Sequence, residues 1–151
     1  MTRHKPNVLF LSTGNATRSI MAQGFLHALT GDRFNTVSAA VEVGSLNPSV
    51  SEVMKEAGID ISTQRPKTIA QSLKEPFGHV VTISDKAKER DPIFPFAIGV
   101  LHWNIVDPNS GPGLSNQKKE LLRRVRDEIQ EKVKRFIADT AELKETELSI
   151  G

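Results

Sequence analysis

The chain has 151 residues, a length at which we expect a single domain over residues 1–151 with its own hydrophobic core. Hydrophobic residues make up 38% and charged residues 25% of it, as in ordinary globular proteins, and a net charge of +2 does not indicate nucleic-acid binding. Because the chain has no cysteine, disulfides, thiolate metal sites and thiol catalysis are excluded.

Neither a membrane segment nor a metal site is predicted. No apolar run approaches the roughly 20 residues that span a bilayer. The N-terminal segment MTRHKPNVLFL lacks the apolar core of a signal peptide, so we expect a cytoplasmic protein. The four histidines show no metal-ligand spacing, and we expect no cofactor.

The first half of the chain alternates between strand and helix patterns. A short apolar run predicts a buried strand at Val8–Leu11, and apolar residues at helical spacing predict a helix at Ile20–Leu29. A second strand is expected at Thr36–Val43. A helix at Val50–Ala57 follows the loop that contains Pro48.

The second half continues the alternation. We expect a short helix around Thr68–Leu73, a third strand at His79–Ile83 and a fourth within Val100–Val106. A long amphipathic helix then runs from Ser115 to about Leu143. This order predicts an α/β fold: a four-stranded parallel sheet with right-handed crossovers and helices on both faces.

In such folds ligands bind beyond the carboxyl ends of the strands. Ser12, Ser84 and Asp107 each follow a predicted strand, so we expect them at one rim of the sheet. The loop from Ser12 to Arg18 is rich in small and polar residues and leads into a helix starting near Ser19.

Gly14 and Asn15 are residue types that adopt left-handed conformations, which would turn successive N–H groups inward as an anion-binding nest. The positive end of the helix and the planar Arg18 fork favour the same ligand, a tetrahedral anion. An ordinary strand–turn–helix with a surface arginine explains the residues equally well. The spacing fits neither a Walker loop nor a dinucleotide fingerprint.

The segment VLFLSTGNATRSIMAQGF resembles the low-molecular-weight protein tyrosine phosphatases and the thioredoxin-type arsenate reductases, whose loop is Cys-x5-Arg-Ser. Four later segments resemble the arsenate reductase branch: NPSVSEVMKEAGIDIS, HVVTISDKAKERDPIFP, LHWNIVDP and RRVRDEI. The resemblance implies a low-molecular-weight phosphatase-like, flavodoxin-like three-layer fold.

The resemblance also implies roles for residues. The implied anion-binding residues are Ser12, Thr13, Gly14, Asn15, Ala16, Thr17, Arg18 and Ser19. Asn15 would hold the shape of the loop, and Ser19 would form a hydrogen bond to the nucleophile position. Asp107 would be the general acid that protonates a leaving oxygen, although an Asp before a Pro is also a common turn former.

The chain departs from these families at every thiol. Ser12 occupies the nucleophile position, and a serine hydroxyl needs a neighbouring base to attack, whereas a thiol with a pKa near 8.5 is readily ionised. Ser84 and Asp91 look like the residues at the other two redox positions of the reductases, and neither side chain can transfer electrons. Arsenate reduction through a thiol relay is therefore not expected.

Three functions stay open. The first is a catalytically silent module that binds phosphate, arsenate or a phosphorylated small molecule or protein, as part of an arsenic or phosphate response. The second is a phosphatase, acting through Ser12 or carrying Ser12 in place of its cysteine, with Asp107 as general acid. The third is an interaction scaffold that retains only the fold. Two origins fit the serine at position 12. The chain could be a natural relative without cysteine, or an active phosphatase whose nucleophile was replaced by engineering so that ligands bind without turnover.

Overall fold

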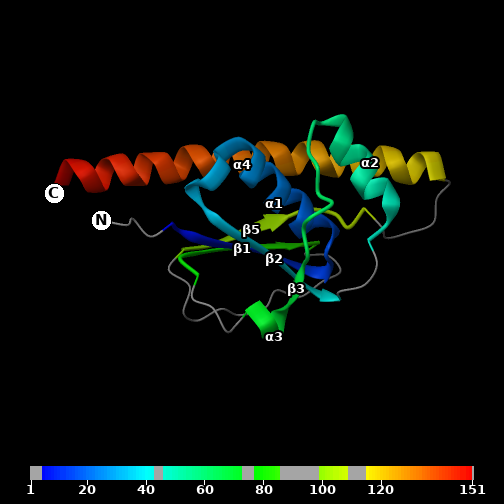
Figure 1. The fold of residues 1–151 in the computed structure, drawn as a ribbon, viewed down its shortest axis with the longest axis horizontal. Coiled ribbons are helices and arrows are strands. Elements are labelled where there is room, and N and C mark those ends of the chain that lie inside the picture. Colours follow the sequence, from blue (N-terminus) through cyan, green and yellow to red (C-terminus); the bar gives the residue numbers. More distant parts are fainter. Residues whose placement is uncertain (1–4, 43–45, 73–76, 86–98, 109–114, 151) are drawn as a thin grey trace.

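The computed structural model describes residues 5–42, 46–72, 77–85, 99–108 and 115–150 (Figure 1). Its strands are β1 (Asn7–Asn15), β2 (Asn35–Glu42), β3 (Lys67–Thr68), β4 (His79–Ser84) and β5 (Gly99–Asn104). Its helices are α1 (Thr17–Thr30), α2 (Pro48–Glu56), α3 (Ile69–Ser72) and α4 (Ser115–Ile150), with a short 3-10 turn at Gly31–Arg33.

The strands form one parallel sheet in the order β3-β2-β1-β4-β5. The predicted parallel α/β fold is confirmed, but the predicted number of four strands is wrong. The extra strand, β3, is two residues long and pairs with Ala39 and Ala40 of β2. Because Lys67 and Thr68 form no apolar run, their pairing has no periodic signal in the sequence.

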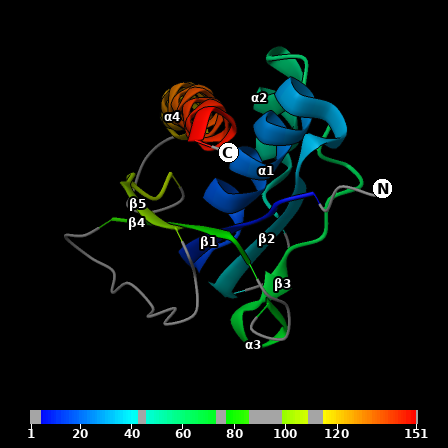
Figure 2. The ribbon, with the colours of Figure 1, turned by 90° about the vertical axis from the view of Figure 1, so that its left-hand side faces the viewer.

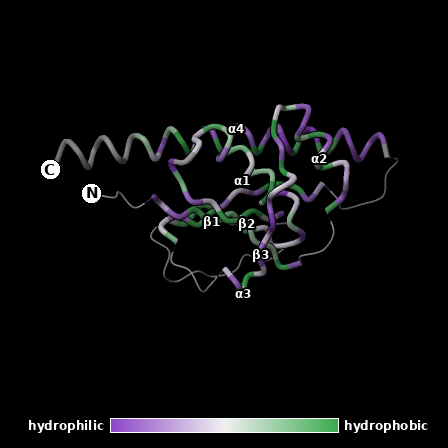
Figure 3. Tube along the Cα trace, in the orientation of Figure 1, coloured by the Kyte–Doolittle hydropathy of each residue, from purple (hydrophilic) through white to green (hydrophobic). Residues whose placement is uncertain are grey.

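The helices divide unequally between the two faces of the sheet. Figure 2 shows α1, α2 and α4 on one face and only α3, among the described helices, on the other. Side chains alternate accordingly along β1: Phe10 packs in the large core beneath the helices, whereas Leu9 and Leu11 belong to a smaller cluster on the α3 face. Hydrophobic residues concentrate along the central strands, as Figure 3 shows.

Helix α4 contributes one apolar stripe to the larger core, as its sequence pattern predicts. The buried residues of this stripe are Leu122, Val125, Ile129, Val133 and Phe136. Figure 1 shows α4 running along the whole molecule, with its C-terminal part extending past the sheet. Within the described ranges, no helix combines the length and apolar character that crossing a membrane requires.

Ion pairs join α2 to α4. Both oxygens of Glu56 accept hydrogen bonds from Arg123, at 2.9 Å from Nε and 2.9 Å from Nη2, and Arg126 Nη1 lies 2.9 Å from the same carboxylate. These bonds, above all those from Arg123, lower the pKa of the Glu56 carboxyl from 4.5 to about 2. The charged form of Glu56 is therefore favoured in the folded protein.

We expect Glu56→Gln to lower the midpoint of urea unfolding at pH 7 and to have no effect near pH 2. The stabilisation is complete above the unfolded pKa of 4.5 and is lost as the pH falls towards about 2, where the folded protein protonates Glu56. Unfolding midpoints of the two proteins between pH 7 and pH 2 test this. Glu131→Gln, which removes a 3.6 Å ion pair within α4, is the control. A pH-independent difference for Glu56→Gln would contradict the expectation.

Candidate anion-binding site

The end of β1 has an unexpected shape. Ser12 pairs with Ala40 and Asn15 with Glu42, so one extra residue is accommodated as a β-bulge between them. Strand β1 thus continues through Gly14 to Asn15, and α1 begins at Thr17, earlier than predicted.

The predicted left-handed conformations of Gly14 and Asn15 are wrong. Among the described residues, positive φ angles occur at Gly31 (61°) and Gly58 (78°), which follow α1 and α2. The reason is pairing with β2: Asn15 remains in register with Glu42, which keeps this part of the loop extended. Glycine and asparagine allow a left-handed turn but do not require one.

The Ser12 hydroxyl lies at the N-terminal end of α1. Its Oγ accepts a hydrogen bond of 2.8 Å from the backbone N–H of Ser19, and both residues are fully buried. Ser19 Oγ in turn donates to the carbonyl of Ala16 at 3.1 Å. The hydroxyl therefore satisfies one of the N–H groups that the first turn of a helix leaves without a helical partner, and the positive end of α1 faces Ser12.

Asn15 connects this end of α1 to Asp107. Its Oδ1 accepts a hydrogen bond of 3.0 Å from the N–H of Thr17, and its Nδ2 lies 3.3 and 3.2 Å from the two carboxylate oxygens of Asp107. The bond joins residues 92 positions apart in the sequence. It brings Asp107 to the loop, as expected from its place after the last strand.

Arg18 is a fully buried cation. Its Nη1 donates a 2.9 Å hydrogen bond to the carbonyl of Ile105, whose own N–H donates to the carbonyl of Ser84 at 3.0 Å. The guanidinium therefore joins the start of α1 to the segment that follows β5. Burial of a charged side chain is costly unless specific contacts compensate it, so the position of Arg18 is tightly determined.

Ser84 lies at the same rim as Ser12 but on the opposite face of the sheet. Ser12 is in register with Ile83, so the next side chain, Ser84, points the other way. Ser84 Oγ lies 3.3 Å from His102 Nε2, and His102 Nδ1 lies 2.8 Å from Thr82 Oγ1. The structure therefore does not bring the side chains of Ser12 and Ser84 together. Asp91 lies outside the described residues.

No histidine within the described residues contacts Ser12. His102 contacts Thr82 and Ser84, and the ring of His79 packs edge-on against Phe136 at 5.5 Å, where burial lowers its pKa. In the same described ranges, no group of three His, Cys, Asp or Glu side chains gathers as a metal site. The described contacts of the Ser12 hydroxyl thus include a backbone N–H donor, from Ser19, and no histidine base.

A pocket of about 290 Å³ opens beside Ala16 and was not predicted from the sequence. Its other walls include Ile20 of α1 and the segment Ile61–Pro66 between α2 and β3. That segment can approach α1 because Gly24 has no side chain: a Cβ there would lie 3.1 to 3.2 Å from Ile59, Ile61 and Gln64. A glycine inside a helical pattern is a signal of such close packing.

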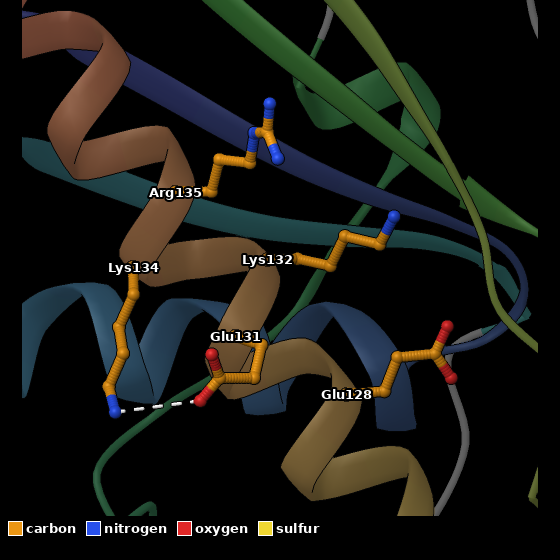
Figure 4. A pocket seen from close by; sticks show the side chains of 5 residues that line it. All are labelled: Glu128, Glu131, Lys132, Lys134 and Arg135. Atoms are coloured by element: carbon orange, nitrogen blue, oxygen red, sulfur yellow. Dashed lines mark ion pairs between the residues drawn. The ribbon is translucent and has the colours of Figure 1, made fainter.

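A second hollow of about 510 Å³ lies along α4 and shares no residue with the loop. Figure 4 shows its lining side chains, Glu128, Glu131, Lys132, Lys134 and Arg135, all of which come from this one helix. Two acidic and three basic side chains lie there, and Lys134 pairs with Glu131 at 3.6 Å. The pattern is typical of a solvated helix face.

Similarity to known proteins agrees with this geometry. Residues 7–148 match the family "Low molecular weight phosphotyrosine protein phosphatase". The chain is 39% identical to an arsenate reductase of Bacillus licheniformis over 138 residues, which cover 91% of this chain and 99% of that protein.

Solved structures are similar as well. A structure described as "An arsenate reductase in the phosphate binding state" superposes with a TM-score of 0.74 at 27% identity, covering 89% of this chain and 98% of that one. The YwlE arginine phosphatase of Geobacillus stearothermophilus superposes with a TM-score of 0.70 at 25% identity, covering 94% of this chain and 96% of the other. The chain therefore belongs to the low molecular weight phosphotyrosine protein phosphatase family.

We expect Ser12→Ala to lower the free energy of unfolding by about 1–2 kcal/mol, because the buried N–H of Ser19 loses its acceptor. Urea unfolding monitored by circular dichroism measures the change. Ser49→Ala, near the start of α2 where the Ser49 N–H is capped by Asn47 Oδ1, is the control and should have little effect. Equal stabilities for the two variants would contradict the structural role of the Ser12 hydroxyl.

Proposed function

We propose that this protein binds a tetrahedral oxyanion at the segment Ser12–Ser19, as inorganic phosphate, arsenate or the phosphate group of a larger molecule, and that it has no thiol-based catalysis. The observation that carries the proposal is the Ser12 hydroxyl, buried at the positive end of α1 and held by the N–H of Ser19 at 2.8 Å, next in the chain to the buried Arg18. A related arsenate reductase has been solved in a phosphate-binding state, which supports the ligand class.

The electrostatics favour an anion there. The N-terminus of a helix carries about half a positive charge, and an arginine adds a full charge with a planar set of donors. A thiolate at position 12 would repel a doubly charged oxyanion by about 2 kcal/mol at 4 Å even in water. The neutral hydroxyl of Ser12 removes that repulsion, so this residue favours binding while it disfavours nucleophilic attack.

Reduction of arsenate to arsenite requires two electrons, which thiols supply when they are oxidised to a disulfide. The chain has no cysteine, and Ser12, Ser84 and Asp91 cannot replace one. The separation of Ser12 and Ser84 on opposite faces of the sheet also disfavours transfer between them. A binding role, as a sensor or regulator in an arsenic or phosphate response, accounts for these features.

One observation favours a second candidate, a phosphatase whose nucleophilic cysteine has been replaced by Ser12. Asp107 is held at the loop by Asn15, where a general acid could protonate the oxygen of a leaving alcohol. A pure binding protein has less need of that carboxylate. Restoring a thiol at position 12 separates the two candidates.

We expect inorganic phosphate and arsenate to bind the protein and to bind Arg18→Ala more weakly by about tenfold to a hundredfold, since charge-assisted hydrogen bonds are lost. Isothermal titration calorimetry at fixed salt measures both affinities. Arg18→Lys keeps the charge without the planar fork and should bind with intermediate affinity, provided that circular dichroism shows it folded. Equal affinity in folded Arg18→Lys and the parent protein, or no binding by the parent protein, would contradict the proposal.

We expect Ser12→Cys to have a thiol pKa below 8.5, because the N–H of Ser19 and the positive end of α1 favour the thiolate. Absorbance at 240 nm as a function of pH measures the pKa. Above that pKa the variant should bind doubly charged phosphate about thirtyfold more weakly than the parent protein, from charge repulsion of about 2 kcal/mol. Turnover of an aryl phosphate by Ser12→Cys, absent from Ser12→Cys/Asp107→Asn, would support the phosphatase alternative.

A further inference from the structure

The inner part of the proposed oxyanion site is inaccessible in the conformation described. Ser12, Arg18 and Ser19 have no exposed surface, and Thr17 is only 1% exposed. An anion in solution therefore does not reach the buried cation or the first turn of α1 unless the segment moves. Because a ligand stabilises only a conformation with which it makes contacts, binding requires a second, more open conformation of this segment.

Donors that an oxyanion needs are already engaged within the chain. The N–H of Thr17 donates to Asn15 Oδ1 at 3.0 Å, and the N–H of Ser19 donates to Ser12 Oγ at 2.8 Å. Arg18 Nη1 donates to a backbone carbonyl at 2.9 Å. An oxyanion that takes one of these donors replaces an existing hydrogen bond, so its net gain is smaller than the strength of the new bond alone.

The outer part of the segment, residues 13–15, is half-buried and belongs to strand β1. Asn15 remains in register with Glu42 of β2, and its φ angle is not positive. The groups of an extended strand alternate in direction, whereas an anion-binding nest requires successive N–H groups to converge on one point. The nest must therefore form by a change in the backbone at Asn15.

The contact between the Asn15 amide and the Asp107 carboxylate opposes that change. Asn15 Nδ2 lies 3.2 and 3.3 Å from the two carboxylate oxygens, while its Oδ1 accepts the N–H of Thr17. The carboxylate thus orients the amide so that the amide oxygen is directed at the start of α1. A hydrogen bond to an ionised acceptor is about twice as strong as one between neutral groups, so this contact contributes strongly to the position of Asn15.

We propose that the contact between Asn15 and Asp107 is an autoinhibitory latch, which holds the oxyanion site closed and opens when an oxyanion binds. This inference rests on the proposed oxyanion site and describes how that site is regulated. On opening, the Asn15 amide leaves the N–H of Thr17, which becomes available to the anion. The apparent affinity is then the intrinsic affinity reduced by the small fraction of molecules in the open conformation.

The first test measures the latch without any ligand. Hydrogen–deuterium exchange of the Thr17 amide, followed by nuclear magnetic resonance, should be about tenfold to a hundredfold faster in Asp107→Ala than in the parent protein, because the charge-assisted bond that orients Asn15 is lost. Asn35→Ala is the matched control. It removes a 3.0 Å bond between Asn35 and Asn7 at the opposite end of the β1–β2 pair, and should leave this exchange rate unchanged.

The second test separates the latch from simple charge repulsion by calorimetry with inorganic phosphate. Asp107→Asn and Asp107→Ala both remove the negative charge, but Asp107→Asn keeps an acceptor oxygen for Asn15 Nδ2. Asp107→Ala should therefore bind phosphate about three- to tenfold more tightly than Asp107→Asn, which corresponds to one neutral hydrogen bond, and more tightly than the parent protein. Circular dichroism verifies that each variant is folded.

The outcomes distinguish this inference from the proposal on which it rests. If inorganic phosphate does not bind the parent protein, the oxyanion site is wrong and the regulation of that site falls with it. If phosphate binds the parent protein but Thr17 exchanges equally fast in Asp107→Ala, the latch is wrong and the oxyanion site stands. Equal phosphate affinities of Asp107→Ala and Asp107→Asn overturn the latch in the same way, because charge alone then accounts for the effect of Asp107.

Discussion

The hydrogen bond from the N–H of Ser19 to the hydroxyl of Ser12 is the constraint on which the site depends. It joins the last buried residue of the central strand to the third residue of α1, and so fixes where the helix begins and what its positive end faces. Asn15 and Arg18 then connect the same point to Asp107 and Ile105, beyond the far strand. The uncharged hydroxyl of Ser12 is sufficient as the acceptor of this hydrogen bond. The start of α1 can therefore be held in place without a thiol at position 12.

The two faces of the sheet have different characters. The face under α1, α2 and α4 carries the large core and the candidate anion site. On the opposite face, Thr82, His102 and Ser84 form a separate polar chain across β4 and β5. Strand alternation, rather than distance along the chain, decides which of the residues at the rim can act together.

The sequence predicted much of this arrangement because its signals are local and periodic. Apolar spacing located the central strands and the buried stripe of α4, and the positions of Ser12 and Asp107 after strands predicted a shared rim. Sequence-based prediction was wrong where pairing between distant strands determines the local conformation. Strand β3 is too short and polar to show a period, and pairing of Asn15 with Glu42 keeps the loop extended where residue type favoured a left-handed turn. The segment around Gln64 packs closely against α1 at Gly24, and the hydrophobic periodicity of the sequence does not predict this contact.

The opposite orientation of Ser12 and Ser84 also bears on how this chain could change. A disulfide requires two Cβ atoms about 3.5–4.5 Å apart with their S–S torsion unstrained, and side chains on opposite faces of one sheet do not meet that condition without backbone movement. Cysteines introduced at both positions would stay two separate thiols in this conformation. A disulfide between these two positions would therefore need a rearranged rim as well as two introduced sulfur atoms.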